Sequence, residues 1–114
     1  TPGCYVVTRN LSISAPATYA IHVTASDVTI DLNGFTLKGD SYSIGSGILQ
    51  ALGADRLTVR NGFITGVGHP VMAERKGNRL EDLTVFDCGD ATSLGDGALV
   101  RGCVFAGHML NTGS

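Results

Sequence analysis

An internal repeat constrains the fold of this chain more than any other feature of its sequence. In four segments aliphatic and polar residues alternate, and Gly, Asn or Asp follows within a few positions. They are DVTIDLNGFTLKG (27–39), RLTVRNGFITG (56–66), DLTVFDCGD (82–90) and, more weakly, ALVRGCVFAG (98–107). Self-similarity at a period of about 20–50 residues indicates a solenoid, in which each repeat buries its apolar face against its neighbours.

The repeats can be aligned on one aliphatic position. Ile30, Val59 and Val85 then occupy equivalent places, and the two steps between them are similar in length. The next step, from Val85 to Val100, is little more than half as long. This alignment therefore predicts that the last turn of the solenoid is either shortened or differently aligned.

A second aliphatic series supports the same period independently. Ile21, Ile48 and Val71 each precede one of the repeats, and they follow one another at spacings close to those of the first series. One chance match would not produce two series with similar spacings, so the period indicates a repeating structural unit.

Each repeat contains short β-strands. In the segment 28–32, Val28, Ile30 and Leu32 alternate with polar residues, which is the pattern of a half-buried strand. Asn-Gly pairs follow the strands at 33–34 and 61–62 and are also typical of β-hairpins. A meander or a sandwich is therefore the alternative fold. Parallel coils are favoured because residues of one type recur at equivalent places, as threonine does at Thr29, Thr58 and Thr84.

Composition narrows the class of protein. Hydrophobic residues make up 43% of the 114 residues and charged residues 16%, which suits one packed domain over residues 1–114 and argues against disorder. The net charge of −2 argues against a nucleic-acid partner, and the apolar runs are too short to cross a membrane. Three cysteines without a CxxC pair give no zinc motif, and no cofactor is predicted.

The strings ASDVTIDLNGFTL and LTVRNGFITG resemble the right-handed parallel β-helix proteins of the pectate-lyase-like superfamily. The resemblance implies an all-β, right-handed parallel β-helix of about four to five short coils with three strands per coil, either whole or a section of a longer β-helix. It also implies a polysaccharide partner and an extracellular or periplasmic location. It says little about chemistry, because this fold carries lyases, hydrolases, epimerases, tailspikes, adhesins and modules without activity.

The family's three strands can be mapped onto the chain. The three predicted faces are 21–23, 48–50, 71–73 and 92–94; then 28–32, 57–60, 83–86 and 98–101; then 35–37, 63–65 and 103–105. Segments 5–7 and 11–13 are expected to form an incomplete opening coil. The sequence contains no amphipathic helix to cap either end. An uncapped coil lacks half of its neighbours, so self-association through a coil end is predicted.

One outward column of the second face is the candidate binding site. It consists of Asp31, Arg60, Phe86 and Arg101, in which the two arginines could grip acidic sugars. In the related lyases an Arg or Lys abstracts the proton beside a uronate, often with Ca²⁺ held by several carboxylates. This column has one carboxylate, so no metal is predicted. The alternative is an exposed cross-coil ion pair between Asp31 and Arg60.

Other candidates each have a structural alternative. The threonine column could bind an ordered lattice, or it could reflect β-propensity alone. The remaining candidates are a metal site of His69, His108 and Asp90; a glycosidase pair among Asp87, Asp90 and Asp96; and a disulfide or an apolar stack of Cys88 and Cys103. For the first two of these the alternative is an ordinary polar turn.

Two classes of function follow. The first is a non-catalytic β-helix module for glycan binding, protein binding or structural assembly. The second is a fragment of a carbohydrate-active enzyme, a polysaccharide lyase or glycoside hydrolase, using Arg60, Arg101 and Asp31. The first is favoured because the chain is short and its carboxylates are sparse.

Overall fold

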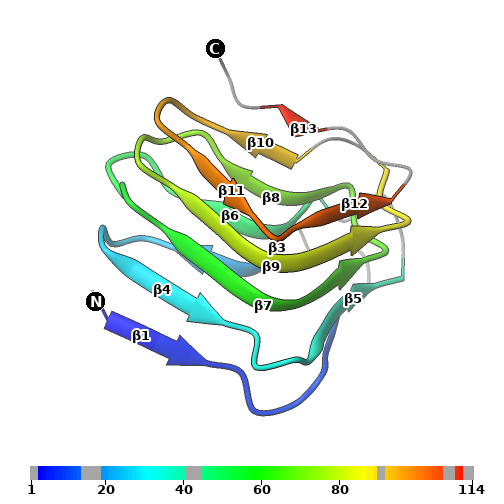
Figure 1. Cartoon of the computed structure of the whole chain (residues 1–114). Helices are drawn as coiled ribbons and strands as arrows, with labels where there is room; N and C mark the ends of the chain where they lie inside the picture. The colour runs from blue at the N-terminus through cyan, green and yellow to red at the C-terminus, as the bar shows by residue number, and fades with distance from the viewer. Residues whose placement is uncertain (1–2, 14–18, 41–44, 90–91, 107–109, 112–114) are drawn as a thin grey trace.

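The computed structural model describes residues 3–13, 19–40, 45–89, 92–106 and 110–111, which form β-strands joined by short turns (Figure 1). Every pair of neighbouring strands among these residues is parallel. A meander or sandwich, which needs antiparallel neighbours, is therefore wrong. The strands are β1 (Gly3–Val6), β2 (Leu11–Ile13), β3 (Tyr19–Val23), β4 (Val28–Asp31), β5 (Thr36–Gly39), β6 (Ser46–Gln50), β7 (Thr58–Thr65), β8 (His69–Ala73), β9 (Arg79–Phe86), β10 (Thr92–Leu94), β11 (Leu99–Arg101), β12 (Val104–Ala106) and β13 (Leu110–Asn111).

The strands form two sheets that wind into a parallel β-solenoid of about four turns. Sheet A contains β1, β2, β4, β5, β7, β9, β11 and β12, and sheet B contains β3, β6, β8, β10 and β13. Each coil takes one strand from sheet B and then crosses sheet A. The successive coils are β3–β4–β5, β6–β7, β8–β9 and β10–β11–β12, and they rise from blue to orange in Figure 1.

The prediction of three strands per coil is corrected to roughly two, because the second and third predicted strands merge in the central coils. β7 runs without a break through both of its predicted segments, and β9 is equally long although only 83–86 was predicted in that coil. The bends fall at Asn61 and Asp82, whose φ angles are 64° and 53°. Asn and Asp enter this left-handed region more readily than other side chains do. The strand pairing continues on both sides of the bend, with Arg60 opposite Glu81 before it and Gly62 opposite Leu83 after it.

The predicted register of the first series is correct at one step and wrong at the next. Ile30 pairs with Val59, as predicted. Val59, however, pairs with Leu80, while Val85 pairs with Ile64 beyond the bend. Leu80 and Val85 both point into the core, since the bend at Asp82 shifts the inward alternation by one residue.

The corrected register shows that the last turn is differently aligned rather than shortened. Val100 pairs with Leu80, so the step from Leu80 to Val100 is nearly as long as the step from Val59 to Leu80. The coils are therefore longer near the N-terminus and nearly constant in length towards the C-terminus.

The second series is confirmed. Ile21 pairs with Ile48, and Ile48 pairs with Val71, in sheet B. The predicted opening coil is also present, because β1 pairs with β4 and β2 pairs with β5.

The core is a column of aliphatic side chains enclosed by both sheets. Its fully buried large members are Leu32, Leu37, Ile48, Leu57, Ile64, Leu80, Leu83, Leu94, Val59, Val67 and Val71. Burial of one such side chain stabilises the fold by about 1.5–3 kcal/mol, so the stacked aliphatic residues are the main source of stability. No helix among the described residues has the length and apolar character needed to cross a lipid bilayer.

A buried amide pair closes the corner between the two sheets. Asn78 is 1% exposed, and its Nδ2 donates to Gln50 Oε1 at 3.0 Å while its Oδ1 accepts from Gln50 Nε2 at 2.8 Å. Asn78 Oδ1 also accepts from the Leu57 amide at 2.9 Å. Its Nδ2 additionally lies 2.7 Å from the Ala73 carbonyl oxygen and 2.9 Å from that of Arg75. Asn78, in the charged loop between β8 and β9 (74–78), thus ties the C-terminal ends of β6 and β8 to Leu57, the residue before β7.

The two ends of the solenoid are stepped rather than flat. At the N-terminal end, β1 and β2 add a layer to sheet A, and no described strand of sheet B lies in that layer. At the C-terminal end, β13 adds a layer to sheet B beyond β10, and among the described residues sheet A has no strand in that layer. Each end therefore presents half of a coil.

Candidate functional site

The predicted outward column is present, but one of its members is different. Asp31 lies opposite Arg60, Arg60 opposite Glu81, and Glu81 opposite Arg101. Phe86 is not in this column, because it lies at the far end of β9, beyond the bend. The column therefore alternates acidic and basic residues on four successive coils, and Glu81 is the member that sequence alignment missed.

The charges of this column pair across neighbouring coils. Arg60 Nε lies 3.6 Å from Asp31 Oδ2, and Arg101 Nη2 lies 2.9 Å from Glu81 Oε2. The Asp31–Arg60 pair was the structural alternative to a glycan site, and it forms. Pairs of this kind at a surface contribute about 0–1 kcal/mol each. A sugar carboxylate could bind either arginine only by competing with the carboxylate already beside it.

A second group of charges lies at the corner that leads into sheet A. Arg56 Nε and Nη2 donate to the two carboxylate oxygens of Asp27 at 2.6 and 3.1 Å. The hydrogen bond from Arg56 lowers the pKa of Asp27, and the same bond raises the pKa of Arg56. The pair therefore stays ionised until the pH falls through the lowered pKa of Asp27. Both residues are exposed and have φ near 60°, and their contact links the corners of two adjacent coils.

The proposed column of three threonines does not exist. Thr29 lies opposite Thr58, but the next residue in that column is Arg79. Thr84 lies opposite Phe63 instead. Evenly repeated hydroxyls are absent from this face of the described residues, which removes the basis for lattice binding there.

Of the other polar candidates, two of the three metal-site residues lie outside the described residues, and Asp87 and Asp96 do not come together. His108 and Asp90, which were proposed to join His69 at a metal site, lie outside the described residues. Asp87 lies against the turn after β7, whereas Asp96 lies against the turn after β8, so these two carboxylates belong to different corners. Within the described residues no group of three His, Cys, Asp or Glu side chains could hold a metal ion.

The cysteines are free thiols, and the proposed stack of Cys88 on Cys103 is wrong. Cys88 lies beside Val67, and Cys103 lies beside Leu83, in different columns of the core. Burial raises the pKa of the Cys88 thiol, and the nearby Asp87 charge adds to the increase. The pKa of Cys103 is raised by burial in the same way. Both therefore behave as small apolar residues rather than as a redox pair.

We expect the three thiols to differ in reactivity. Cys4 is exposed on β1, so it should react with Ellman's reagent at neutral pH on the order of ten-fold faster than Cys88 and Cys103, which are part-buried with raised pKa values. Mass spectrometry of alkylated peptides would measure each rate separately. In denaturant the three rates should converge, and equal rates in the folded protein would contradict the described burial.

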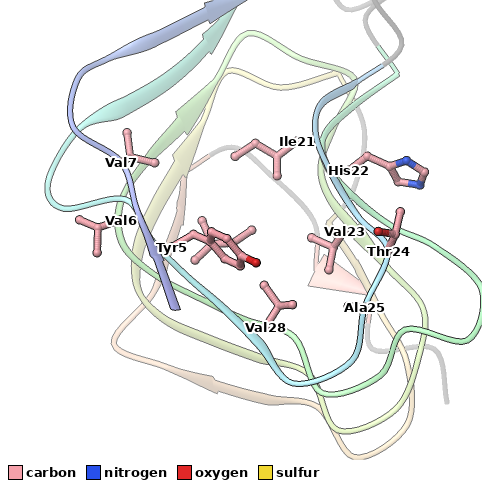
Figure 2. Close-up of a pocket in the computed structure, with 10 residues that line it drawn as sticks. Tyr5, Val6, Val7, Ile21, His22, Val23, Thr24, Ala25 and Val28 are labelled. Carbon is pink, nitrogen blue, oxygen red and sulfur yellow. The ribbon is translucent and has the colours of Figure 1, made fainter. Parts of the chain in front are cut away.

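An apolar opening lies at the N-terminal end of the solenoid. It is a cavity of about 290 Å³ whose wall is formed by β1, by β3 and the turn after it, and by β4. Figure 2 shows the side chains of Tyr5, Val23 and Val28 converging on the interior of the coil, while His22 points away from it. The cavity is thus the open end of the hydrophobic core.

The strand that borders this cavity is poorly covered. Tyr5 and Val6 of β1 are 47% and 53% exposed, although Tyr5 occupies the column that holds Ile30 and Val59 further up the solenoid. At the opposite end, Leu99 and Val104 are also exposed. The sequence predicted uncapped ends, but no pattern in it indicated that one end is hollow.

Comparison of the chain with protein-family models, with curated proteins and with solved structures finds no match. The parallel solenoid is therefore established by the pairing of its own strands.

Proposed function

We propose that this chain is a non-catalytic β-solenoid module of structural assembly, whose copies bind one another through the open N-terminal coil. The observation that carries the proposal is the apolar cavity of about 290 Å³ at that end, bordered by the exposed Tyr5 and Val6. An apolar opening beside an open strand edge is favourable for strand addition, because the partner supplies both backbone hydrogen bonds and apolar side chains.

The finer assignment is also part of this proposal. We infer membership of the pectate-lyase-like superfamily, with an extracellular or periplasmic location, from the Asn-Gly-containing strings at 25–37 and 57–66 and from the parallel coils into which they fold. The paired charges of Asp31, Arg60, Glu81 and Arg101 favour a role in coil stacking over polysaccharide chemistry.

The substitution Tyr5→Lys tests the proposed function. A lysine ammonium at the mouth of the apolar cavity would have to lose its water when a second copy binds, so we expect self-association to weaken by about ten-fold or more. Sedimentation velocity at increasing protein concentration measures this. The wild-type chain is expected to show a rising mass that Tyr5→Lys does not show.

The matched control is Phe63→Lys. Phe63 is 40% exposed on β7, in a central coil far from either end, so this substitution changes charge and hydrophobicity in a similar way without touching the cavity. Self-association of Phe63→Lys should equal that of the wild type. A wild-type chain that stays monomeric at every concentration, or equal effects of the two variants, would refute assembly through the open coil.

A further inference from the structure

The shapes of the two ends are complementary. The N-terminal end carries the sheet A half of a coil, formed by β1 and β2, and leaves one edge of β3 in sheet B without a partner among the described strands. The C-terminal end carries the sheet B half, formed by β13, and leaves β11 and β12 of sheet A paired, among the described strands, with β9 alone. Each end therefore carries the half-coil that the other end lacks.

We infer that copies of this chain associate head to tail, with β13 of one copy entering the step beside β3 of the next copy. β11 and β12 of the first copy would then pair with β1 and β2 of the second, and the two half-coils together would make one complete coil. This inference rests on the proposed function and adds to it the identity and the polarity of the partner surface.

Strand direction and register support this arrangement. β1, β4, β7, β9 and β11 are successively parallel, and so are β3, β6, β8, β10 and β13. A second copy stacked along the same axis therefore offers each free edge a parallel strand. Two N-terminal ends face to face would instead bring antiparallel strands together, unlike every strand pair among the described residues.

The columns of apolar side chains would also continue from one copy into the next. Val100 occupies the inward column of Ile30 and Val59, which is the column of Tyr5 at the other end. Phe105, partly buried against the core, occupies the column that begins with Leu11. Apolar side chains from the C-terminal coil would thus meet the apolar rim of the cavity.

The cavity lies where this arrangement needs an additional strand. Its lining residues come from β1 on one side and from β3 and the turn after it on the other. The cavity therefore lies at the same level as β1, next to the unpaired edge of β3 in sheet B. That is the place which β13 of a second copy would fill. Because the contact uses different surfaces on the two partners, it does not close on itself and would propagate into a filament.

A cross-linking experiment tests the polarity. In a head-to-tail junction the column of Thr29 and Thr58 would bring Leu99 of one copy beside Cys4 of the next. Cys4 is exposed and Leu99 is 42% exposed, so neither substitution below disturbs the core. The wild-type chain is mixed with the double variant Cys4→Ser/Leu99→Cys and treated with a short bismaleimide.

Head-to-tail pairing predicts a cross-linked dimer between the two species, because adjacent strands would hold the thiols about 5 Å apart at the backbone. Peptide mapping should join Cys4 to the new cysteine at position 99. The control mixture uses Cys4→Ser alone, so that any product from Cys88 or Cys103 is measured and subtracted. Circular dichroism verifies that each variant is folded.

The outcomes separate this inference from the proposed function. Cross-linking of Cys4 to Cys4 in the wild type would show that N-terminal ends meet face to face, which overturns the inference and leaves assembly through the open coil intact. Self-association that Tyr5→Lys abolishes, without cross-linking at position 99, also overturns it. Absence of any self-association overturns both.

Discussion

Replacement of Asn78 by leucine is expected to lower the free energy of unfolding by about 4 kcal/mol, a large part of the stability of a domain of this size. The substitution removes the carboxamide that binds Gln50, the Leu57 amide and the carbonyl oxygens of Ala73 and Arg75. The Gln50 side chain, 8% exposed, would be left without its amide partner. Urea denaturation followed by circular dichroism measures the loss.

The control for this prediction is Lys76→Ala, two residues away in the same turn. Lys76 has a backbone carbonyl that accepts from the Arg56 amide, and the substitution keeps that hydrogen bond. We expect a change within about 0.5 kcal/mol. If Asn78→Leu is no more destabilising than Lys76→Ala, the buried amide pair does not hold the corner.

Replacement of Gly66 by alanine is expected to cost about 3 kcal/mol of stability through two effects that act together. Gly66 has a φ of +74°, which is unfavourable for an L side chain. A Cβ at this position would also overlap the carbonyl oxygen of Gly39 on the neighbouring coil. The spacing of the coils is set by strand hydrogen bonds, so the backbone can move away only by weakening them. Chemical denaturation gives the magnitude.

Gly53→Ala separates the two effects. Gly53 has a similar φ of +82°, but a Cβ there would meet no atom within 4 Å. Its substitution should therefore cost only the conformational part, about 1 kcal/mol. Equal losses for Gly66→Ala and Gly53→Ala would mean that the close approach to Gly39 is not important for stability.

The general fold could be predicted because the strongest signal in the sequence is the periodic recurrence of aliphatic residues. Ile21, Ile48 and Val71 each lie in a short strand with one inward direction, so their spacing follows the coil directly. The strand pairing of sheet B repeats that series, and the parallel direction of the coils agrees with the prediction made from columns of like residues.

The register of sheet A could not be predicted for a physical reason. The segments Leu57-Thr58-Val59 and Leu83-Thr84-Val85 are alike in sequence, but the first lies before the bend of its strand and the second lies after it. In a strand that bends at a residue with positive φ, inward and outward side chains alternate both before and after the bend, so the two halves have the same sequence pattern. The pattern alone therefore cannot tell Leu80 from Val85 as the partner of Val59.

The same misalignment explains what was missed in the candidate site. Once Val85 was placed beside Val59, Phe86 took the position beside Arg60 that belongs to Glu81. A signal was available, because Asp31, Arg60, Glu81 and Arg101 alternate in charge and like charges on adjacent coils would repel. Asn78 gave no such signal, since an amide within a charged loop is usually solvated.

The unbroken course of β7 and β9 has a consequence for how the molecule comes apart. These two strands pair with each other on both sides of their bends, and each is also covered by an outer coil. Loss of either outer coil exposes only one edge, so fraying should proceed inward from both ends and stop at this pair. The centre then opens as a single cooperative unit, and its backbone amides should be the slowest to exchange with deuterated water.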